Sequence, residues 1–253
     1  MLHLHGGRLK LESRPLQQCL QVYIPYCTRD AHMADTEKEF PYWSFLGTLP
    51  FRGRRLVLET VTALLGNRTG QTVLFGGLSA GGRGSMVIID PLRQVVDPSN
   101  SLMGIHDSGD YIELTPLNPT LVPFTEQCHR AYSFFNKPAI SDKCGSAYNE
   151  SWKCLCGEFM LPMVQVPSQI IIHQFDSYQL SLNVDKQLPK DWSNEDCLYA
   201  NNRFRPLILR SVGQIVQEGT FLPRQFYLDS AVFISISVQD VMWYLLLHAM
   251  ITG

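Results

Sequence analysis

The sequence has little of three features that assign a protein to a class directly: long apolar runs, an excess of charge of one sign, and a secretory signal. No stretch approaches the roughly 20 apolar residues of a membrane-spanning helix. The C-terminal run at 241–251 is interrupted by His248, and it predicts a buried helix. With 21 Lys and Arg against 23 Asp and Glu, the chain has no basic field for phosphates or anionic lipids. We therefore expect it to bind neither nucleic acid nor a membrane.

The sequence does contain enough apolar material for one sizeable core, because 45% of its 253 residues are hydrophobic. This favours a single domain over residues 1–253. Residues 1–8 lack the apolar core and cleavage site of a secretory signal, so the sequence as given encodes no export.

Cysteine usage, in contrast, favours an extracellular location. Seven cysteines are many for a cytosolic protein, and they predict disulfides and a secreted protein whose N-terminus is missing. The rival interpretation is a metal site at Cys154 and Cys156, but a lone C-x-C lacks the spacing of a zinc cage. We therefore expect no metal and no cofactor. Glycosylation sequons at Asn67 and Asn149 also favour secretion.

Helix and strand signals alternate along the chain, which indicates an α/β fold with a mostly parallel sheet. Apolar residues at helical spacing predict helices at 56–65 and 207–218, and a further helix that includes 85–90. Apolar and β-branched runs predict strands at 19–26, 71–76, 168–175 and within 226–238. Residues 122–158, rich in Cys and aromatics without periodicity, predict an irregular, disulfide-tied excursion.

A glycine-rich turn, Gly77-Leu-Ser79-Ala80-Gly81, stands between a predicted strand and a predicted helix, which is the pattern of a nucleophile elbow. A sharp turn lifts the serine hydroxyl to the top of the sheet, and glycines two residues to either side avoid a collision with neighbouring backbone. Ser79 is then a candidate nucleophile and the N–H of Ala80 a candidate oxyanion donor. The same pattern also fits a loop that merely turns the chain.

Four segments resemble, in order and spacing, the pectin acetylesterase/Notum family: VYIPYCTRDAHM at 22–33, FRG at 51–53, GLSAGG at 77–82 and DSG at 107–109. The resemblance covers residues 19–240. It implies an α/β-hydrolase-like fold and removal of acyl groups from oxygen: acetate from pectin in some members, palmitoleate from a secreted signalling protein in others. The expected partner is an O-acylated polysaccharide or protein, the expected location extracellular, and the expected state a monomer.

The resemblance also implies roles for side chains outside the turn. It assigns the orienting acid to Asp176, within FDSYQ at 175–179. Such a carboxylate accepts the distal N–H of a histidine and stabilises the imidazolium. The alternative is a strand-end aspartate that caps the next turn. Asp107 is a competing acid, which the resemblance makes a structural or pocket-lining residue, with Ser108 also lining the pocket and His32 in a loop near the mouth of the site.

The histidine base of the family is not found at its expected position. The counterpart of the family's late Ser/Ala-Cys-x-x-His motif is SAVFI at 230–234, which puts Ile234 where the base should stand. Loss of the base in a serine hydrolase costs on the order of 10⁶ in kcat. We therefore expect an error in the sequence near the C-terminus, an inactive family member, or a base recruited from elsewhere.

Four histidines are candidates for recruitment. His248 is the only one after Asp176 and keeps the Ser–Asp–His order, although a histidine in an apolar helix is more often a core residue. His173 is expected inside the sheet, and His106 and His32 are the others.

The family's glycine-rich oxyanion segment and the first strands of its sheet have no counterpart in this sequence. We therefore expect an N-terminally truncated α/β-hydrolase-like domain with a serine carboxylesterase site. The alternative is an inactive member that binds an acyl or glycan ligand, and a third interpretation is a plain α/β fold without an active site.

Overall fold

The computed structural model describes residues 19–26, 29–37, 39–41, 48–135, 142–186, 191–218, 227–229 and 243–248. Its main sheet has the strand order β1-β8-β4-β5-β6-β7. The strands are β1 Cys19–Val22, β4 Thr72–Leu78, β5 Ser101–Asp107, β6 Ser168–His173, β7 Tyr227–Asp229 and β8 Trp243–His248. Strands β4 to β7 run parallel, whereas β8 runs antiparallel to both β1 and β4. Two short strands, β2 Glu39–Pro41 and β3 Thr48–Pro50, form a separate antiparallel pair.

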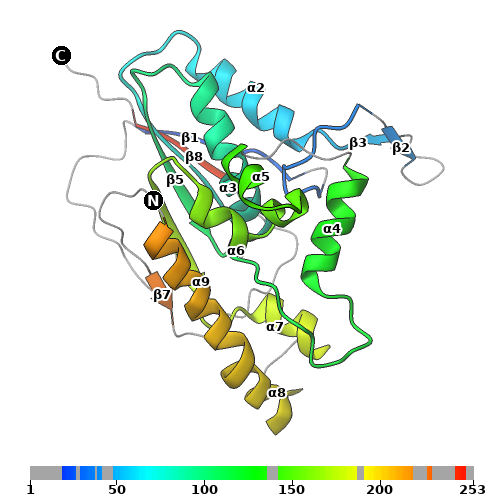
Figure 1. Ribbon diagram of the computed structural model, residues 1–253. Coiled ribbons are helices and arrows are strands. Elements are labelled where there is room, and N and C mark those ends of the chain that lie inside the picture. Colours follow the sequence, from blue (N-terminus) through cyan, green and yellow to red (C-terminus); the bar gives the residue numbers. More distant parts are fainter. Residues whose placement is uncertain are drawn as a thin grey trace.

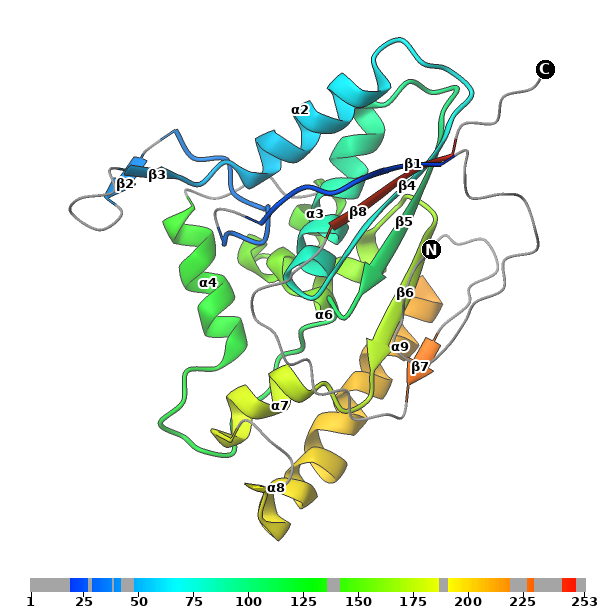
Figure 2. The ribbon, with the colours of Figure 1, turned by 180° about the vertical axis from the view of Figure 1, so that it is seen from behind.

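Helices α3, α6 and α9 lie on one face of the sheet, and α7 and α8 lie beyond the carboxyl ends of β5 and β6 (Figures 1 and 2). The longer helices are α2 Gly53–Leu65, α3 Ala80–Val95, α4 Phe124–Phe134, α7 Ser177–Val184 and α9 Arg205–Glu218. The shorter ones are α5 Asp142–Ala147, η2 Ser151–Leu155, α6 Gly157–Met160, η3 Leu161–Met163, α8 Asn194–Tyr199 and η5 Ala200–Phe204. Within the described ranges, no helix has the length and apolar character to cross a bilayer.

The arrangement confirms the predicted α/β class and most of the predicted elements. The helix at 56–65 is part of α2, the strand at 71–76 is part of β4, and α3 follows the glycine-rich turn at once. The strand at 168–175 and the helix at 207–218 correspond to β6 and α9. The strand predicted at 19–26 ends at Val22, and most of 226–238 lies outside the described residues.

Two predictions are wrong. The described part of the C-terminal apolar run, Trp243–His248, is a strand, because β8 is inserted between β1 and β4 rather than packed as a buried helix. The described residues of 122–158 are not irregular, since they include the 11-residue helix α4 and several short turns of helix. The predicted tie is present in this segment as the disulfide Cys144–Cys154, which also removes Cys154 as a metal ligand.

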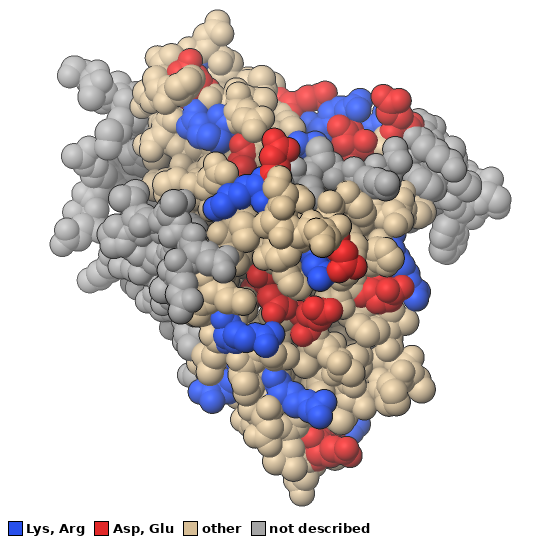
Figure 3. Space-filling view, viewed as in Figure 1, with Lys and Arg blue, Asp and Glu red and all other residues tan. Residues whose placement is uncertain are grey.

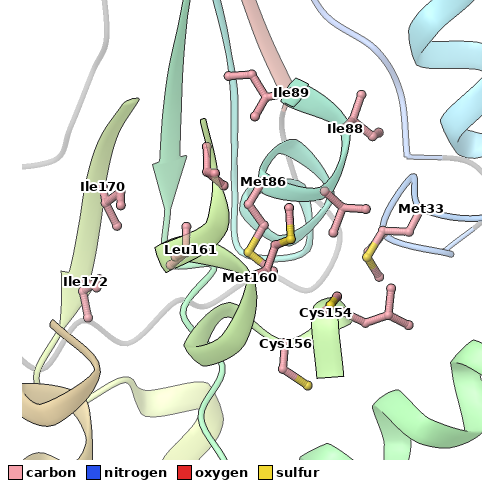
Figure 4. Packing of buried hydrophobic residues seen from close by; sticks show 14 of the residues in the cluster. Met33, Met86, Ile88, Ile89, Cys154, Cys156, Met160, Leu161, Ile170 and Ile172 are labelled. Carbon is pink, nitrogen blue, oxygen red and sulfur yellow. The ribbon is translucent and has the colours of Figure 1, made fainter. Parts of the chain in front are cut away.

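The core lies between the sheet and the covering helices. Helix α3 contributes Met86, Ile88 and Ile89, all fully buried, and β6 contributes Ile170 and Ile172 (Figure 4). On the face shown in Figure 3, acidic and basic residues are interspersed, which agrees with the small net charge.

The start of α2 is fixed by Asp30. Its two carboxylate oxygens accept hydrogen bonds from the backbone N–H groups of His32 (2.9 Å) and Gly53 (3.0 Å). A Cβ at Gly53 would lie 2.5 Å from Asp30 Oδ1 and 2.6 Å from His32 Cα. The segments 22–33 and 51–53, two of the four that carry the resemblance, therefore meet in a structural joint.

A matched pair of glycine substitutions tests this joint. Gly53→Ala is expected to lower the free energy of unfolding by about 1–3 kcal/mol, because the added methyl group collides with Asp30 and with backbone. Gly213→Ala, in α9 with no atom within 4 Å of the added carbon apart from the neighbouring backbone of its own helix, is expected to raise it by about 0.5–1 kcal/mol. Urea unfolding measures both, and equal shifts in the same direction would contradict the proposed contact.

Candidate active site

Ser79 lies at the junction of β4 and α3, in a strained backbone conformation with φ of 56°. Positive φ is uncommon for a residue with a side chain and costs on the order of 1–3 kcal/mol. The N–H of Ser79 donates to the carbonyl oxygen of Asp107 (2.8 Å), which ties the turn to the end of β5. The residue is partly buried at the carboxyl edge of the parallel strands. This is the edge at which open α/β sheets bind ligands.

The surrounding glycines allow this turn sterically. A Cβ at Gly77 would lie 2.5 Å from the carbonyl carbon of Gly81, so the two glycines of the G-x-S-x-G pattern face each other. A Cβ at Gly82 would collide with the carbonyl oxygen of Asp107. The pattern therefore corresponds to a tight strand–turn–helix packed against β5, as the elbow interpretation predicts.

The end of β5 supplies two of the predicted pocket-lining residues. The Asp107 carboxylate accepts a hydrogen bond from Ser108 Oγ (2.8 Å), and Ser108 N–H continues onto β6 by donating to Ile171 O (2.9 Å). Burial raises the pKa of Asp107, whereas the Ser108 hydroxyl and His173 act in the opposite direction. Both residues lie beside the turn that carries Ser79.

Tyr111 is the site residue that sequence reasoning missed. Its hydroxyl shares a hydrogen bond of 3.2 Å with Ser79 Oγ, and its ring stacks on Phe124 of α4 at 4.4 Å. The Arg83 guanidinium lies over both rings, 5.1 Å and 4.7 Å from their centroids. Burial first and the charge of Asp176 second raise the pKa of Tyr111, so this phenol is a neutral hydrogen-bonding partner of Ser79 and not its base.

Asp176 lies just after β6, at the same edge of the sheet. Its side chain caps α7 by accepting from the N–H of Gln179 (2.9 Å), so the simpler role as a cap is present. Burial raises its pKa, while the Gln179 N–H and His173 counteract this. Its charge also acts on Tyr111, whose hydroxyl is hydrogen-bonded to Ser79, so one phenol interacts with both the acid and the serine.

The strand register is incompatible with His248 as the base. His248 is opposite Thr72 at the first residue of β4, whereas Ser79 follows the last residue of the same strand. A strand rises about 3.3 Å per residue, so the two backbones are separated by roughly 20 Å. The prediction from chain order failed because β8 runs antiparallel to β4 and carries its C-terminus to the opposite edge.

Two further histidines have structural environments. His106 is fully buried, with Nδ1 2.7 Å from Ser85 Oγ and Nε2 3.1 Å from Ser168 Oγ, and burial lowers its pKa to about 3. His32 is 1% exposed beside the Tyr26 ring, and burial lowers its pKa to about 4. Such burial does not fit an open mouth, and a pocket-lining role for His32 stays a prediction.

The sequence suggested that His173 is held in the sheet interior, but the structure places it at the edge of the sheet. It is the last residue of β6, with its side chain 19% exposed, and its Nε2 is 3.9 Å from Asp107 Oδ1. It also interacts electrostatically with Asp176. The structure thus brings one histidine together with both candidate acids at the edge that carries Ser79.

Asp110 is a buried acid in the loop that follows β5. Asp110 Oδ1 accepts from Ser211 Oγ of α9 (3.1 Å), and burial, with the nearby charges of Glu158 and Asp176, raises its pKa to about 7. Glu158 in turn pairs with Arg210 of α9 at 3.3 Å. Asp110 therefore connects the loop before Tyr111 to the helix that covers β6.

The raised pKa of Asp110 predicts a pH-dependent stability. Between an unfolded pKa near 4 and a folded pKa near 7 the folded state binds more protons, so stability falls as the pH rises through this range. Asp110→Asn is expected to reduce this loss, by about 1.4 kcal/mol per unit of pKa shift. Urea unfolding at pH 5 and pH 8 measures this change in the free energy of unfolding.

Asp97→Asn is the control, because Ser99 lowers the pKa of Asp97 and moves its titration below this range. Equal pH dependence in the Asp110 variant and the wild type would contradict the prediction.

Known proteins with similar sequences and structures belong to the family that the sequence segments resemble. The family described as Pectinacetylesterase matches residues 16–211. Palmitoleoyl-protein carboxylesterase NOTUM of Drosophila melanogaster is 27% identical in an alignment of 184 residues that covers 68% of this chain and 27% of that protein. The NOTUM protein of Homo sapiens is 26% identical in an alignment of 178 residues that covers 64% of this chain and 34% of that protein. The Mus musculus protein is 24% identical in an alignment of 266 residues, gaps included, that covers 89% of this chain and 52% of that protein.

The sequence thus spans about a quarter to a half of the length of these relatives. Among solved structures, that of the Wnt deacylase Notum from Drosophila superposes with a TM-score of 0.67. The superposition covers 80% of this chain and 57% of the other at 20% identity, which shows a shared fold.

Proposed function

Because this chain belongs to the pectinacetylesterase family, we propose that it is a carboxylic ester hydrolase whose nucleophile is Ser79. One observation carries the proposal: Ser79 stands with positive φ in a tight strand–turn–helix at the carboxyl edge of the parallel strands. A turn that merely reversed the chain would need neither the strained serine nor its exposure at this edge.

The proposed reaction is acyl transfer through a covalent intermediate. Ser79 Oγ attacks the carbonyl carbon of the acyl group, its proton passes to a base, and the carrier alcohol leaves with a proton returned from that base. Water then hydrolyses the acyl-serine and releases the carboxylic acid. The N–H of Ala80, the first residue of α3, has no intrahelical acceptor and is assigned to the oxyanion. Such a donor contributes about 2.7–4 kcal/mol in other enzymes.

We assign the base to His173. Of the histidine side chains that the structure describes, it is the one beside both Asp107 and Asp176. Either carboxylate can stabilise the imidazolium that forms when Ser79 loses its proton, and Asp176 is the proposed orienting acid. The position that corresponds to the family's usual base, Ile234, lies outside the described residues.

The proposed substrate is an O-acylated glycan or protein. The curated relatives above are named as palmitoleoyl-protein carboxylesterases, and the family description is that of a pectin acetylesterase. The ring of Phe124, which is partly exposed and stacks on Tyr111 beside Ser79, offers an apolar surface to an acyl group. Cys144–Cys154 supports a secreted protein, because disulfides persist in oxidising compartments.

A binding protein is the second candidate, and one observation favours it. Ser79 Oγ is hydrogen-bonded to the phenol of Tyr111, and within the described part of the chain no histidine is hydrogen-bonded to it. A family member without a base would keep the pocket and hold an acylated ligand without turning it over.

Labelling with a fluorophosphonate separates the two functions. In a hydrolase the probe forms a covalent bond with Ser79 Oγ, so the wild type is expected to be labelled and Ser79→Ala is not. An unlabelled wild type that is folded, as judged by circular dichroism, and that binds an acylated ligand would favour the binding protein. Absence of both labelling and binding would leave only the fold.

A further inference from the structure

Two buried cysteine thiols outside the proposed catalytic group lie next to each other, each on a different segment of the chain. Cys128 is on α4 and Cys156 occupies the N-cap position of α6, and both are free thiols close enough to interact. Cys128 is 1% exposed and Cys156 is fully buried. Helix α4 packs against η2, the turn that immediately precedes Cys156. The sulfur atoms of Cys154 and Cys156 are directed to different sides of this segment, the first toward its disulfide with Cys144 (Figure 4).

The charge beside this pair makes it chemically distinctive. The partly buried guanidinium of Arg83 donates to Cys128 Sγ (3.4 Å) and to Leu155 O (3.2 Å), and its Nε has no hydrogen-bond partner among the described residues. Within the described part of the chain, no carboxylate forms an ion pair with it. A hydrogen bond from Cys156 and the Arg83 charge lower the pKa of Cys128, whereas burial raises that of Cys156. One thiol is thus favoured as the attacking thiolate and the other as its proton-bearing partner.

We propose that Cys128 and Cys156 form a second disulfide, which joins α4 to the segment already closed by Cys144–Cys154. The oxidant is a small-molecule disulfide such as oxidised glutathione. The Cys128 thiolate attacks one of its sulfur atoms and expels one glutathione thiolate. Cys156 then loses its proton, attacks Cys128 Sγ in the mixed disulfide and expels the second. Two protein thiols are oxidised by two electrons, and the oxidant is reduced to two thiols.

Burial dictates when this exchange takes place. With Cys128 and Cys156 both closed off from solvent, the bond forms before α4 has packed or while it is open. Once formed, it fixes α4 and therefore Phe124, the ring that stacks on Tyr111 beside Ser79. The tie does not depend on Ser79 being a nucleophile, because it concerns the wall of the pocket.

Peptide mapping tests the bond directly. The chain is secreted from a eukaryotic host behind an added signal peptide, alkylated without reduction and digested with trypsin. Cleavage after Lys153 separates Cys144 from Cys154, so three peptides, 94–130, 144–153 and 154–186, carry the four cysteines. Two disulfides hold all three peptides in one species, which reduction dissolves. Release of 94–130 with alkylated Cys128, while 144–153 stays linked to 154–186, would overturn the proposal, as would linkage of 94–130 to any other cysteine.

Variants control for shuffling between neighbouring cysteines. Cys156→Ser is expected to release 94–130 and retain the link between 144–153 and 154–186. It is also expected to lower the Tm by about 5 °C or more, through loss of the cross-link. Cys197→Ser, at an exposed free cysteine on α8, is expected to change neither the three-peptide species nor the Tm. A Cys156→Ser chain that still holds 94–130 would place the bond at Cys154 and contradict the assignment.

Discussion

Ser79→Ala is expected to reduce kcat/KM for a p-nitrophenyl ester by a factor on the order of 10³ to 10⁶ relative to the wild type. The substitution removes the oxygen that attacks the acyl carbon and leaves the fold nearly intact, since among the described residues the hydroxyl makes one side-chain hydrogen bond, to Tyr111. The strained backbone at this position stays as it is, because alanine adopts positive φ no more readily than serine.

Ser99→Ala is the matched control. Ser99 carries the same hydroxyl on an exposed turn before β5, at the opposite edge of the sheet from Ser79, and is expected to keep wild-type kcat/KM. Initial rates at several ester concentrations measure all three proteins, with circular dichroism to verify folding. Activity in Ser79→Ala within threefold of the wild type would exclude Ser79 as the nucleophile. A wild type without turnover, whose ligand affinity changes in Ser79→Ala, would favour the binding function.

The elbow could be predicted from sequence because all of its determinants are local. The apolar run of β4, the glycines on either side of Ser79 and the helical spacing of α3 lie within about 25 consecutive residues. Asp176 was located in the same way, by a continuous apolar strand and the polar residues that follow it. The pattern could not decide whether Asp176 caps α7 or serves as the orienting acid, because one carboxylate can play both roles.

Other parts of the site were missed because their signal is weak or non-local. Alternate residues of β5 are buried, but two of them are Gly104 and His106. Neither is an apolar side chain, so the sequence shows no alternation that would predict the strand. Tyr111 lies in a loop without a motif, and only the folded chain brings it to Ser79. The short apolar run of β8 fits a helix or a strand equally well, and its pairing with β1 and β4 decides between them. The same pairing removed His248 from the site and left His173 as the histidine to test.

His173→Ala is therefore expected to lower kcat by a factor on the order of 10⁶ with little change in KM, because a general base acts in the transition state. Added imidazole is expected to restore part of the lost rate in this variant and to leave the wild type unaffected, since a free base can occupy the vacated space beside Asp107. A structural role for the ring, such as support of the β6 end, would not be rescued in this way.

His129→Ala provides the control, because His129 is exposed on α4 and pairs with Glu126. Its kcat is expected to equal that of the wild type with and without imidazole. Full activity in His173→Ala would contradict the assignment and direct the search to side chains outside the described residues. A loss without rescue would make His173 a positioning residue. If Ser79 is nevertheless labelled by the fluorophosphonate in that variant, the nucleophile and its base are separable, and the esterase proposal survives while its proton acceptor changes.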